Sequence, residues 1–248
     1  ASLLAEKLVK GAGRPLKKVF FSDDGSTALE VALKMAYEYA RRTSRSRAPR
    51  FLSLDGAYHG DTIGATSLGH IDLFHKSYSG LLFKSDKVAS PACYRCPFNR
   101  AKPQRRDARL YAKCNHECGS KVEQKLERRK YAALVVEPRV QGAAGMVMHP
   151  PGWLKRVSAA ARASGALLIA DEVMTGFGRT GELFAGRKEK VTPDFLCLAK
   201  GLTGGYLPMA ATLTTQPVFD AFLGKYEEFK TFFHGHSYTG NQLGAAAA

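Results

Sequence analysis

Short apolar runs of the kind that form buried strands recur along the chain and alternate with helical patterns. The helical patterns cover residues 27–42 and 153–163, and a short amphipathic stretch spans residues 1–13. The apolar runs are 19–22 (VFFS), 50–55 (RFLSLD), 133–138 (ALVVEP), 166–172 (ALLIADE), 195–200 (FLCLAK) and 210–215 (AATLTT). Such alternation predicts an α/β fold, with a mostly parallel sheet flanked by helices.

Two of these runs carry an ionisable side chain where the strand would end. One reaches Asp171 and the other reaches Lys200. Ligands of open α/β sheets bind at the carboxyl ends of the strands, so these positions suit a binding site. Pyridoxal phosphate would use both, because Lys200 can bind its aldehyde covalently and Asp171 can keep its ring nitrogen protonated. The alternative is an Asp that caps a turn and a Lys at an ordinary strand end.

Two further strand ends carry candidate binding residues. Gly25 and Ser26 follow the run 19–22 and open the helical pattern, and free amides at a helix N-terminus can hold a phosphate. A simple helix cap is the alternative, since Gly and Ser both suit that position. Tyr58 follows the run 50–55, where its ring could stack on a flat cofactor or serve only in packing.

The formal net charge of +15 is concentrated in two segments of the 248-residue chain. Residues 41–50 hold five basic and no acidic residues, and residues 93–130 hold twelve basic and four acidic residues. Neither segment interleaves aromatic residues with arginines at a stacking rhythm, so we expect no nucleic-acid partner. A solvated face, attraction of anionic substrates or the composition of the source proteome would each explain the charge. No apolar run approaches the ~20 residues of a membrane span, and no export signal is visible, so we expect a cytoplasmic protein without membrane contact.

Four of the five cysteines fall in the second basic segment. Cys93 and Cys96 form a CxxC pair, and Cys114 and Cys118 follow as a CxxxC pair. The spacing comes close to that of a structural zinc site, in which four thiolates surround the metal. The alternative is a polar insertion with reduced thiols. We expect Cys197, inside an apolar run, to lie in the core.

Six short blocks follow one another along the chain, namely SDDGS, YHGDT, EPRVQGAAGM, LIADEVMTGFGRTG, AKGLTGGYLP and HGHSYTGN. In this order they resemble the large domain of fold-type I, class III pyridoxal-phosphate-dependent aminotransferases. The resemblance covers nearly the whole length, so residues 1–248 are expected to form one cofactor-binding domain. The family's N-terminal segment and C-terminal small domain would lie outside it.

The resemblance implies catalytic roles for three residues. Lys200 matches the Schiff-base lysine, Asp171 the partner of the ring nitrogen, and Tyr58 the residue that covers the pyridine ring. Gly25 and Ser26 match the pair that binds the cofactor phosphate. No metal is expected at this site.

Further contacts with the cofactor follow from the same resemblance. It places His59 and Glu137 among the cofactor-binding residues and Gln141 near the ring substituents. Ser237 stands where the family usually has a threonine whose hydroxyl reaches the phosphate of the neighbouring subunit. The resemblance therefore implies a homodimer with shared active sites.

The blocks YHGDTIGA and FFHGHSYTGNQLG most resemble the members that act in biotin biosynthesis. Those members convert 8-amino-7-oxononanoate into 7,8-diaminononanoate, with adenosylmethionine or lysine as the amino donor. Asp61 matches an acid associated with them, and with Tyr58 it is expected to bind the substrate; alternatively, Asp61 caps a helix starting at Thr62. Three other functions stay open, namely a class III transaminase for omega-amino acids or diamines, a class III aminomutase, and a non-catalytic basic binding module.

Overall fold

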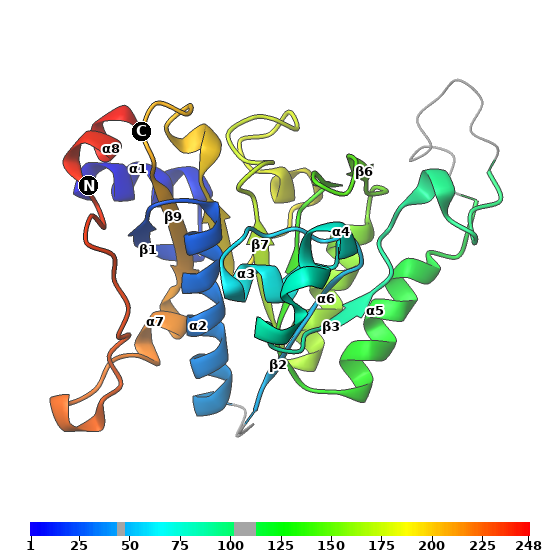
Figure 1. Cartoon of the computed structure of the whole chain (residues 1–248), viewed down its shortest axis with the longest axis horizontal. Coiled ribbons are helices and arrows are strands. Elements are labelled where there is room, and N and C mark those ends of the chain that lie inside the picture. Colours follow the sequence, from blue (N-terminus) through cyan, green and yellow to red (C-terminus); the bar gives the residue numbers. More distant parts are fainter. Residues whose placement is uncertain (44–47, 102–112) are drawn as a thin grey trace.

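A seven-stranded sheet forms the centre of the molecule (Figure 1), which is a computed structural model describing residues 1–43, 48–101 and 113–248. The strand order is β1-β9-β8-β7-β4-β2-β3. Strands β3, β2, β4, β7 and β8 pair in parallel, whereas β9 runs antiparallel to both β8 and β1. The strands are β1 (Leu16–Ser22), β2 (Arg50–Leu54), β3 (Asp86–Val88), β4 (Tyr131–Val136), β7 (Leu167–Asp171), β8 (Phe195–Leu198) and β9 (Ala210–Thr215). The prediction of a mostly parallel sheet is confirmed.

Helices cover both faces of this sheet, as the alternating pattern predicted. A small hairpin of β5 (Val140–Gln141) and β6 (Val147–Met148) stands apart from the sheet. The α-helices are α1 (Ser2–Ala12), α2 (Gly25–Thr43), α3 (Ile63–Leu68), α4 (Asp72–His75), α5 (Glu117–Arg128), α6 (Trp153–Ser164), α7 (Gln216–Asp220) and α8 (Gln242–Ala247).

Alternate side chains along each strand point to opposite helical layers. In β4, Ala133 and Val135 belong to the apolar cluster built on α2, and Leu134 and Val136 belong to the cluster built on α5 and α6. A third cluster packs α1 against β7, β8 and β9. Because both faces are covered, the central strands are apolar throughout, which is why their sequences read as continuous runs.

The parallel strands bring four connecting segments to one edge of the sheet. Strands β2, β4, β7 and β8 share a direction, so the residues after their carboxyl ends lie at the same edge. Strand β1 runs antiparallel to β9, as β8 does, so α2 begins at that edge as well. The fold thus gathers Gly25 and the segments after Leu54, Val136, Asp171 and Leu198.

The sequence patterns missed one strand of the sheet. Strand β3 lies outside every apolar run of the sequence. It has three residues, two of them the polar Asp86 and Lys87, and it pairs only with β2 at the sheet's edge. A strand this short and polar shows no periodic hydrophobic pattern in the sequence. Among the described residues, no helix is long and apolar enough to cross a membrane.

A truncation in the central strand tests this account of the core. Leu134 lies in β4, between β7 and β2, and is 0% exposed. Leu73 on α4 is 88% exposed. We expect Leu134→Ala to lower the free energy of unfolding by about 2–5 kcal/mol, because it removes buried methyl groups and leaves a cavity. Leu73→Ala is the matched control and should change it by less than about 0.5 kcal/mol. Urea denaturation measures both, and equal losses would contradict the assigned core.

Candidate active site

A cavity of about 770 Å³ opens at this edge of the sheet. Its lining comes from the start of α2 and from the segments after β2, β4, β7 and β8. Seven residues that the sequence singled out line it, namely Gly25, Ser26, Tyr58, His59, Glu137, Asp171 and Lys200. Residues far apart along the chain thus meet around one space large enough for a cofactor-sized ligand.

The first turn of α2 offers two free amides to the cavity. The Thr27 N–H donates to Asp24 Oδ1 at 2.9 Å, so the third amide is capped within the protein. The amides of Gly25 and Ser26 have no hydrogen-bond partner in the described part of the chain. A Cβ atom at Gly25 would come within 2.6 Å of Val173 Cγ1, so this position needs glycine. Two free amides at the positive end of a 19-residue helix fit an anionic group such as a phosphate.

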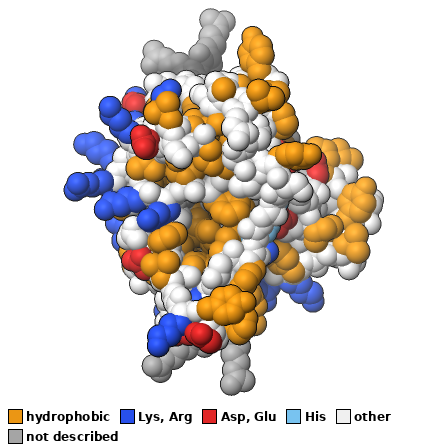
Figure 2. Space-filling model, turned by 90° about the vertical axis from the view of Figure 1, so that its left-hand side faces the viewer, with side chains coloured by type: hydrophobic (Ala, Val, Ile, Leu, Met, Phe, Trp, Pro, Cys, Tyr) orange, Lys and Arg blue, Asp and Glu red, His pale blue; other side chains and the backbone are white. Residues whose placement is uncertain are grey.

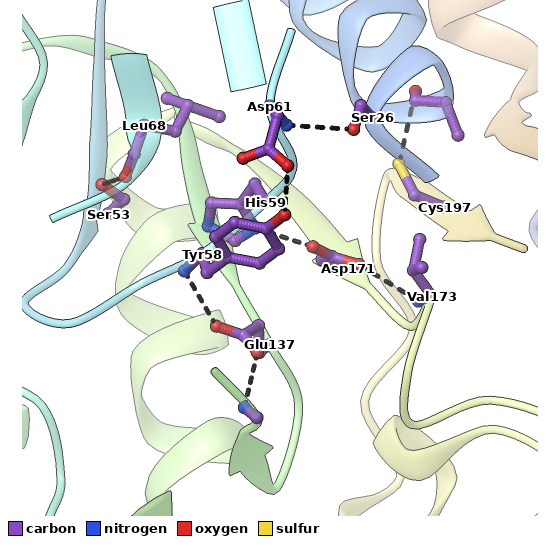
Figure 3. Close-up of polar contacts among 12 residues, drawn as sticks. Ser26, Ser53, Tyr58, His59, Asp61, Leu68, Glu137, Asp171, Val173 and Cys197 are labelled. Carbon is purple, nitrogen blue, oxygen red and sulfur yellow. Dashed lines mark hydrogen bonds and ion pairs between the residues drawn. The ribbon is translucent and has the colours of Figure 1, made fainter. Parts of the chain in front are cut away.

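Asp171 is buried at the end of β7 and is held by two donors. His59 Nδ1 donates to its Oδ2 at 2.7 Å, and the Val173 N–H donates to its Oδ1 at 3.1 Å (Figure 3). Burial opposes protonation of His59, but the hydrogen bond and charge of Asp171, with the charge of Glu137, raise its pKa overall. The carboxylate of Asp171 therefore favours the protonated form of His59. Such a carboxylate can hold the protonated nitrogen of an aromatic ring.

Glu137 follows β4 and fixes two loops at the cavity. Its Oε2 accepts the Gly142 N–H at 2.9 Å, and its Oε1 accepts the Tyr58 N–H at 3.3 Å. Burial raises the pKa of Glu137 to about 7, and the nearby charge of His59 opposes this rise. A carboxyl group with a pKa near neutrality beside a cavity is typical of functional sites.

Tyr58 stands at the cavity with its hydroxyl tied to Asp61. The hydroxyl donates to Asp61 Oδ2 at 2.8 Å, and partial burial together with this bond raises the pKa of Tyr58 to about 12. Asp61 is exposed and does not itself line the cavity. It does not cap the next helix either, because α3 begins at Ile63 and Glu30 accepts the amides of its first turn. The alternative reading of Asp61 as a helix cap is therefore wrong.

Lys200 follows β8 in an unusual backbone conformation. Its φ angle is 42°, in the left-handed region that non-glycine residues seldom adopt. It begins the 3-10 helix Lys200–Leu202 and lines the cavity. Asp171 on β7 pairs with Cys197 on β8, and Lys200 comes three residues after Cys197. Strained conformations of this kind cluster at functional sites.

Two other predicted residues lie outside the cavity lining. Ser237 is exposed in the segment before α8. Gln141 is buried and donates from Nε2 to the Asp55 carbonyl at 2.9 Å, so it is not among the residues that face the cavity. The lining also includes Met174 and Met209, which the sequence reasoning did not single out. Met174 follows β7 within the block LIADEVMTGFGRTG, whereas Met209 directly precedes β9 and lies one residue beyond the block AKGLTGGYLP.

The described residues of the cysteine segment do not line the cavity. Asn99 joins its two parts, donating to the Cys93 carbonyl at 2.9 Å and accepting the Lys113 N–H at 2.9 Å. Within the described residues, no three His, Cys, Asp or Glu side chains are placed as a metal-ligand set. All five cysteines are free thiols, so the structural zinc site stays a prediction. Cys197 is buried among apolar residues, as expected.

The sheet order and the cavity define an α/β domain that presents a lysine, an acid and free helix amides at one strand edge. The chain belongs to the class-III aminotransferase family, whose sequence model matches residues 1–248. The family of pyridoxal-phosphate enzymes expected from the six blocks is thereby confirmed.

Named relatives support the family assignment. An adenosylmethionine-8-amino-7-oxononanoate aminotransferase of Geobacter sulfurreducens is 50% identical over 250 residues, covering 100% of this chain and 53% of that protein. The enzyme of the same name from Methanocaldococcus jannaschii is 43% identical over 252 residues, covering 99% of this chain and 54% of the relative. The chain thus spans about half the length of the curated relatives it matches.

Solved structures share the fold. The crystal structure of the Methanocaldococcus jannaschii enzyme superposes with a TM-score of 0.87 at 40% identity, covering 99% of this chain and 52% of the other. An amine transaminase from an uncultivated Pseudomonas species, in its PLP-bound form, gives a TM-score of 0.88 at 37% identity, covering 99% and 54%.

The raised pKa of Glu137 predicts a pH-dependent stability. Because its pKa of about 7 lies above the ordinary 4.5, the stabilisation is complete below about pH 4.5 and is lost as the pH rises through 7. Glu137→Gln stays neutral, so between pH 5 and pH 8 it should lose less stability than the parent, by on the order of 1–3 kcal/mol. Denaturant unfolding without added cofactor measures the difference.

The matched control is Glu123→Gln, whose carboxylate pairs with Arg156 and has a lowered pKa. It should follow the parent between pH 5 and pH 8. Parallel curves for Glu137→Gln and the parent would refute the raised pKa.

Proposed function

We propose that the protein binds pyridoxal phosphate in this cavity and transfers amino groups in biotin biosynthesis. The acceptor would be 8-amino-7-oxononanoate, the product 7,8-diaminononanoate, and the donor adenosylmethionine or lysine. The observation that carries the proposal is the convergence of Lys200, Asp171 and the free amides of Gly25 and Ser26 on one cavity. Relatives that are 43–50% identical and named for this aminotransferase support the choice of substrate.

The residues around the cavity match the chemical groups of the cofactor. The amides of Gly25 and Ser26 would hold the phosphate, and Asp171, oriented by His59, would hold the ring nitrogen. Tyr58 would cover the ring, and Glu137 would keep the Tyr58 segment in place. When bound, pyridoxal phosphate supplies an electron-accepting ring.

Lys200 would carry out the proton transfers. Its amine would bind the cofactor aldehyde and, once released by the incoming amino donor, move a proton between the donor's α carbon and C4′ of the cofactor. Proton transfer by a positioned side chain contributes typically ~10²–10⁴-fold to the rate. Asp171 would keep the ring nitrogen protonated during this transfer, because its carboxylate is buried and already oriented by two donors.

Asp61 would select the substrate. Its carboxylate is exposed at the tip of Tyr58, where it can meet the charged amine of an incoming substrate. A site built around a charge or a specific hydrogen bond discriminates more strongly than an apolar pocket does.

A homodimer is part of the proposal and would bring Ser237 to the phosphate of the partner copy. Figure 2 shows hydrophobic side chains gathered on the face where α1 and α8 lie. The large exposed apolar side chains of the last 30 residues are Leu223, Tyr226, Phe229, Phe233, Tyr238 and Leu243. Exposed apolar surface of this extent is typical of protein interfaces. We place the enzyme in the cytoplasm, where five free thiols would stay reduced.

A transaminase acting on other amines is the second candidate. It is favoured by the amine transaminase that is 37% identical over 99% of this chain. Assay of the two acceptors separates the candidates, because only the biotin-pathway enzyme would aminate 8-amino-7-oxononanoate efficiently.

Covalent labelling tests the cofactor assignment. We expect the protein with pyridoxal phosphate to absorb visible light and borohydride to fix the cofactor to Lys200, because that amine lines the cavity. Peptide mapping by mass spectrometry locates the label. Lys200→Ala should abolish it, and Lys188→Ala, an exposed lysine in the 3-10 helix Ala185–Glu189, should leave it unchanged. Labelling at another lysine would overturn the assignment.

Substrate selection by Asp61 gives a second test in the intact protein. We expect Asp61→Asn to lower kcat/KM for 8-amino-7-oxononanoate by about 10- to 100-fold, the effect of losing one charge-assisted hydrogen bond. The half-reaction with the amino donor should change much less. Stopped-flow absorbance measures both, with Asp72→Asn, an exposed acid of α4, as the control. Equal losses in both half-reactions would remove Asp61 from substrate selection.

A further inference from the structure

One face of α2 is bonded to the segment that carries Tyr58 and Asp61. Ser26 and Glu30 lie one turn apart on this helix and therefore share a face. Ser26 Oγ accepts the Asp61 N–H at 3.2 Å (Figure 3). Glu30 Oε1 accepts the Thr62 hydroxyl at 2.6 Å and the amides of Gly64 and Ala65 at 2.7 and 3.1 Å.

Two glycines make this contact possible. A Cβ atom at Gly60 would overlap Ser26 Oγ, and Gly60 also has a φ of 123°. A Cβ atom at Gly64 would overlap the carboxylate of Glu30. Helix α2 and residues 60–65 therefore meet without any side chain between them at these two points, which fixes their relative position closely.

Glu30 also supplies the hydrogen-bond acceptor that the first amides of the short helix α3 lack within their own segment. This helix has six residues, and its N-cap residue Thr62 makes no side-chain bond to it. Helices of this length are not stable alone, and their first amides need an acceptor. Glu30 provides that acceptor from 34 residues earlier in the chain.

We propose that Glu30 is a positioning residue: its carboxylate docks the segment 58–65 on α2, so that Tyr58 and Asp61 keep their place beside the phosphate-binding turn. Elsewhere the segment is held near its start, where His59 bonds to Asp171 at 2.7 Å and the Tyr58 N–H reaches Glu137 at 3.3 Å. The Tyr58 hydroxyl bonds to Asp61 within the segment itself, so the part from Asp61 onwards depends on α2. What Tyr58 and Asp61 then do rests on the proposed function.

The chain offers a sharp test in the pair Glu30→Ala and Gly64→Ala. Glu30→Ala removes the acceptor, and Gly64→Ala inserts a methyl group where the carboxylate lies. Alanine has a higher helix propensity than glycine, and Gly64 has no positive φ. If the contact with Glu30 had no role, Gly64→Ala should therefore leave the stability of α3 unchanged or raise it. If the contact positions the segment, each variant loosens it and the double variant loosens it no further.

Hydrogen exchange of the intact, cofactor-free protein measures this loosening. We expect the amides of residues 62–68 to exchange roughly 10- to 100-fold faster in either single variant, because a charge-assisted cap is lost. The amides of residues 58–61 should also exchange faster. Glu38→Ala is the matched control on the same helix, and it should change neither region. The partners of Glu38 among the described residues are Arg41 and Arg42.

Cofactor affinity is the second measurement. The dissociation constant of pyridoxal phosphate, followed by absorbance, should rise about ten-fold in Glu30→Ala and Gly64→Ala. Faster exchange confined to residues 62–68 would overturn the inference, because Glu30 would then only cap α3. Unchanged exchange in both regions would overturn it as well. If the parent binds no pyridoxal phosphate, the proposed function fails, and exchange at residues 58–61 still decides the positioning role.

Discussion

The contact between His59 and Asp171 is the interaction on which the arrangement of the site depends. It joins the segment after β2 to the end of β7, across the intervening strand β4. Both side chains are buried, and a carboxylate buried without partners would be strongly unfavourable. Removing one member of such a pair costs ~3–5 kcal/mol. The placement of Asp171 at the cavity therefore depends on the loop that carries Tyr58 and His59 staying in place.

That loop is held from three directions. His59 bonds to β7 behind it, Glu137 accepts its amide from the end of β4, and α2 contacts it through Ser26 and Glu30. The same helix presents the free amides of Gly25 and Ser26 to the cavity, so the first turn of α2 is bonded directly to the loop. A parallel sheet makes this possible, because it delivers the carboxyl ends of neighbouring strands to a single edge.

The sequence predicts the parts of the site that depend on strand ends. Lys200 and Asp171 could be placed together because buried parallel strands read as apolar runs and finish at a common edge. Side-chain contacts between separate helices and loops leave no such pattern in the sequence. The carboxylate of Glu30 caps α3, which begins 33 residues later, and Lys34, one turn further along α2, approaches His234. Packing of α2 against α3 decides that pairing, and periodicity does not encode it.

Several unfavourable features gather at this one edge of the sheet. Lys200 adopts a left-handed conformation, Glu137 is buried with a pKa of about 7, and the buried His59 Nε2 has no partner among the described residues. Each costs of order 1–3 kcal/mol, whereas the strands beneath are fully packed. Comparable features also occur away from the cavity lining, such as the buried Glu172, whose pKa is raised to about 7, and the unpartnered His149 Nδ1. What distinguishes the cavity is that a lysine amine, a buried acid and a titratable carboxyl group line the same space, within reach of one ligand.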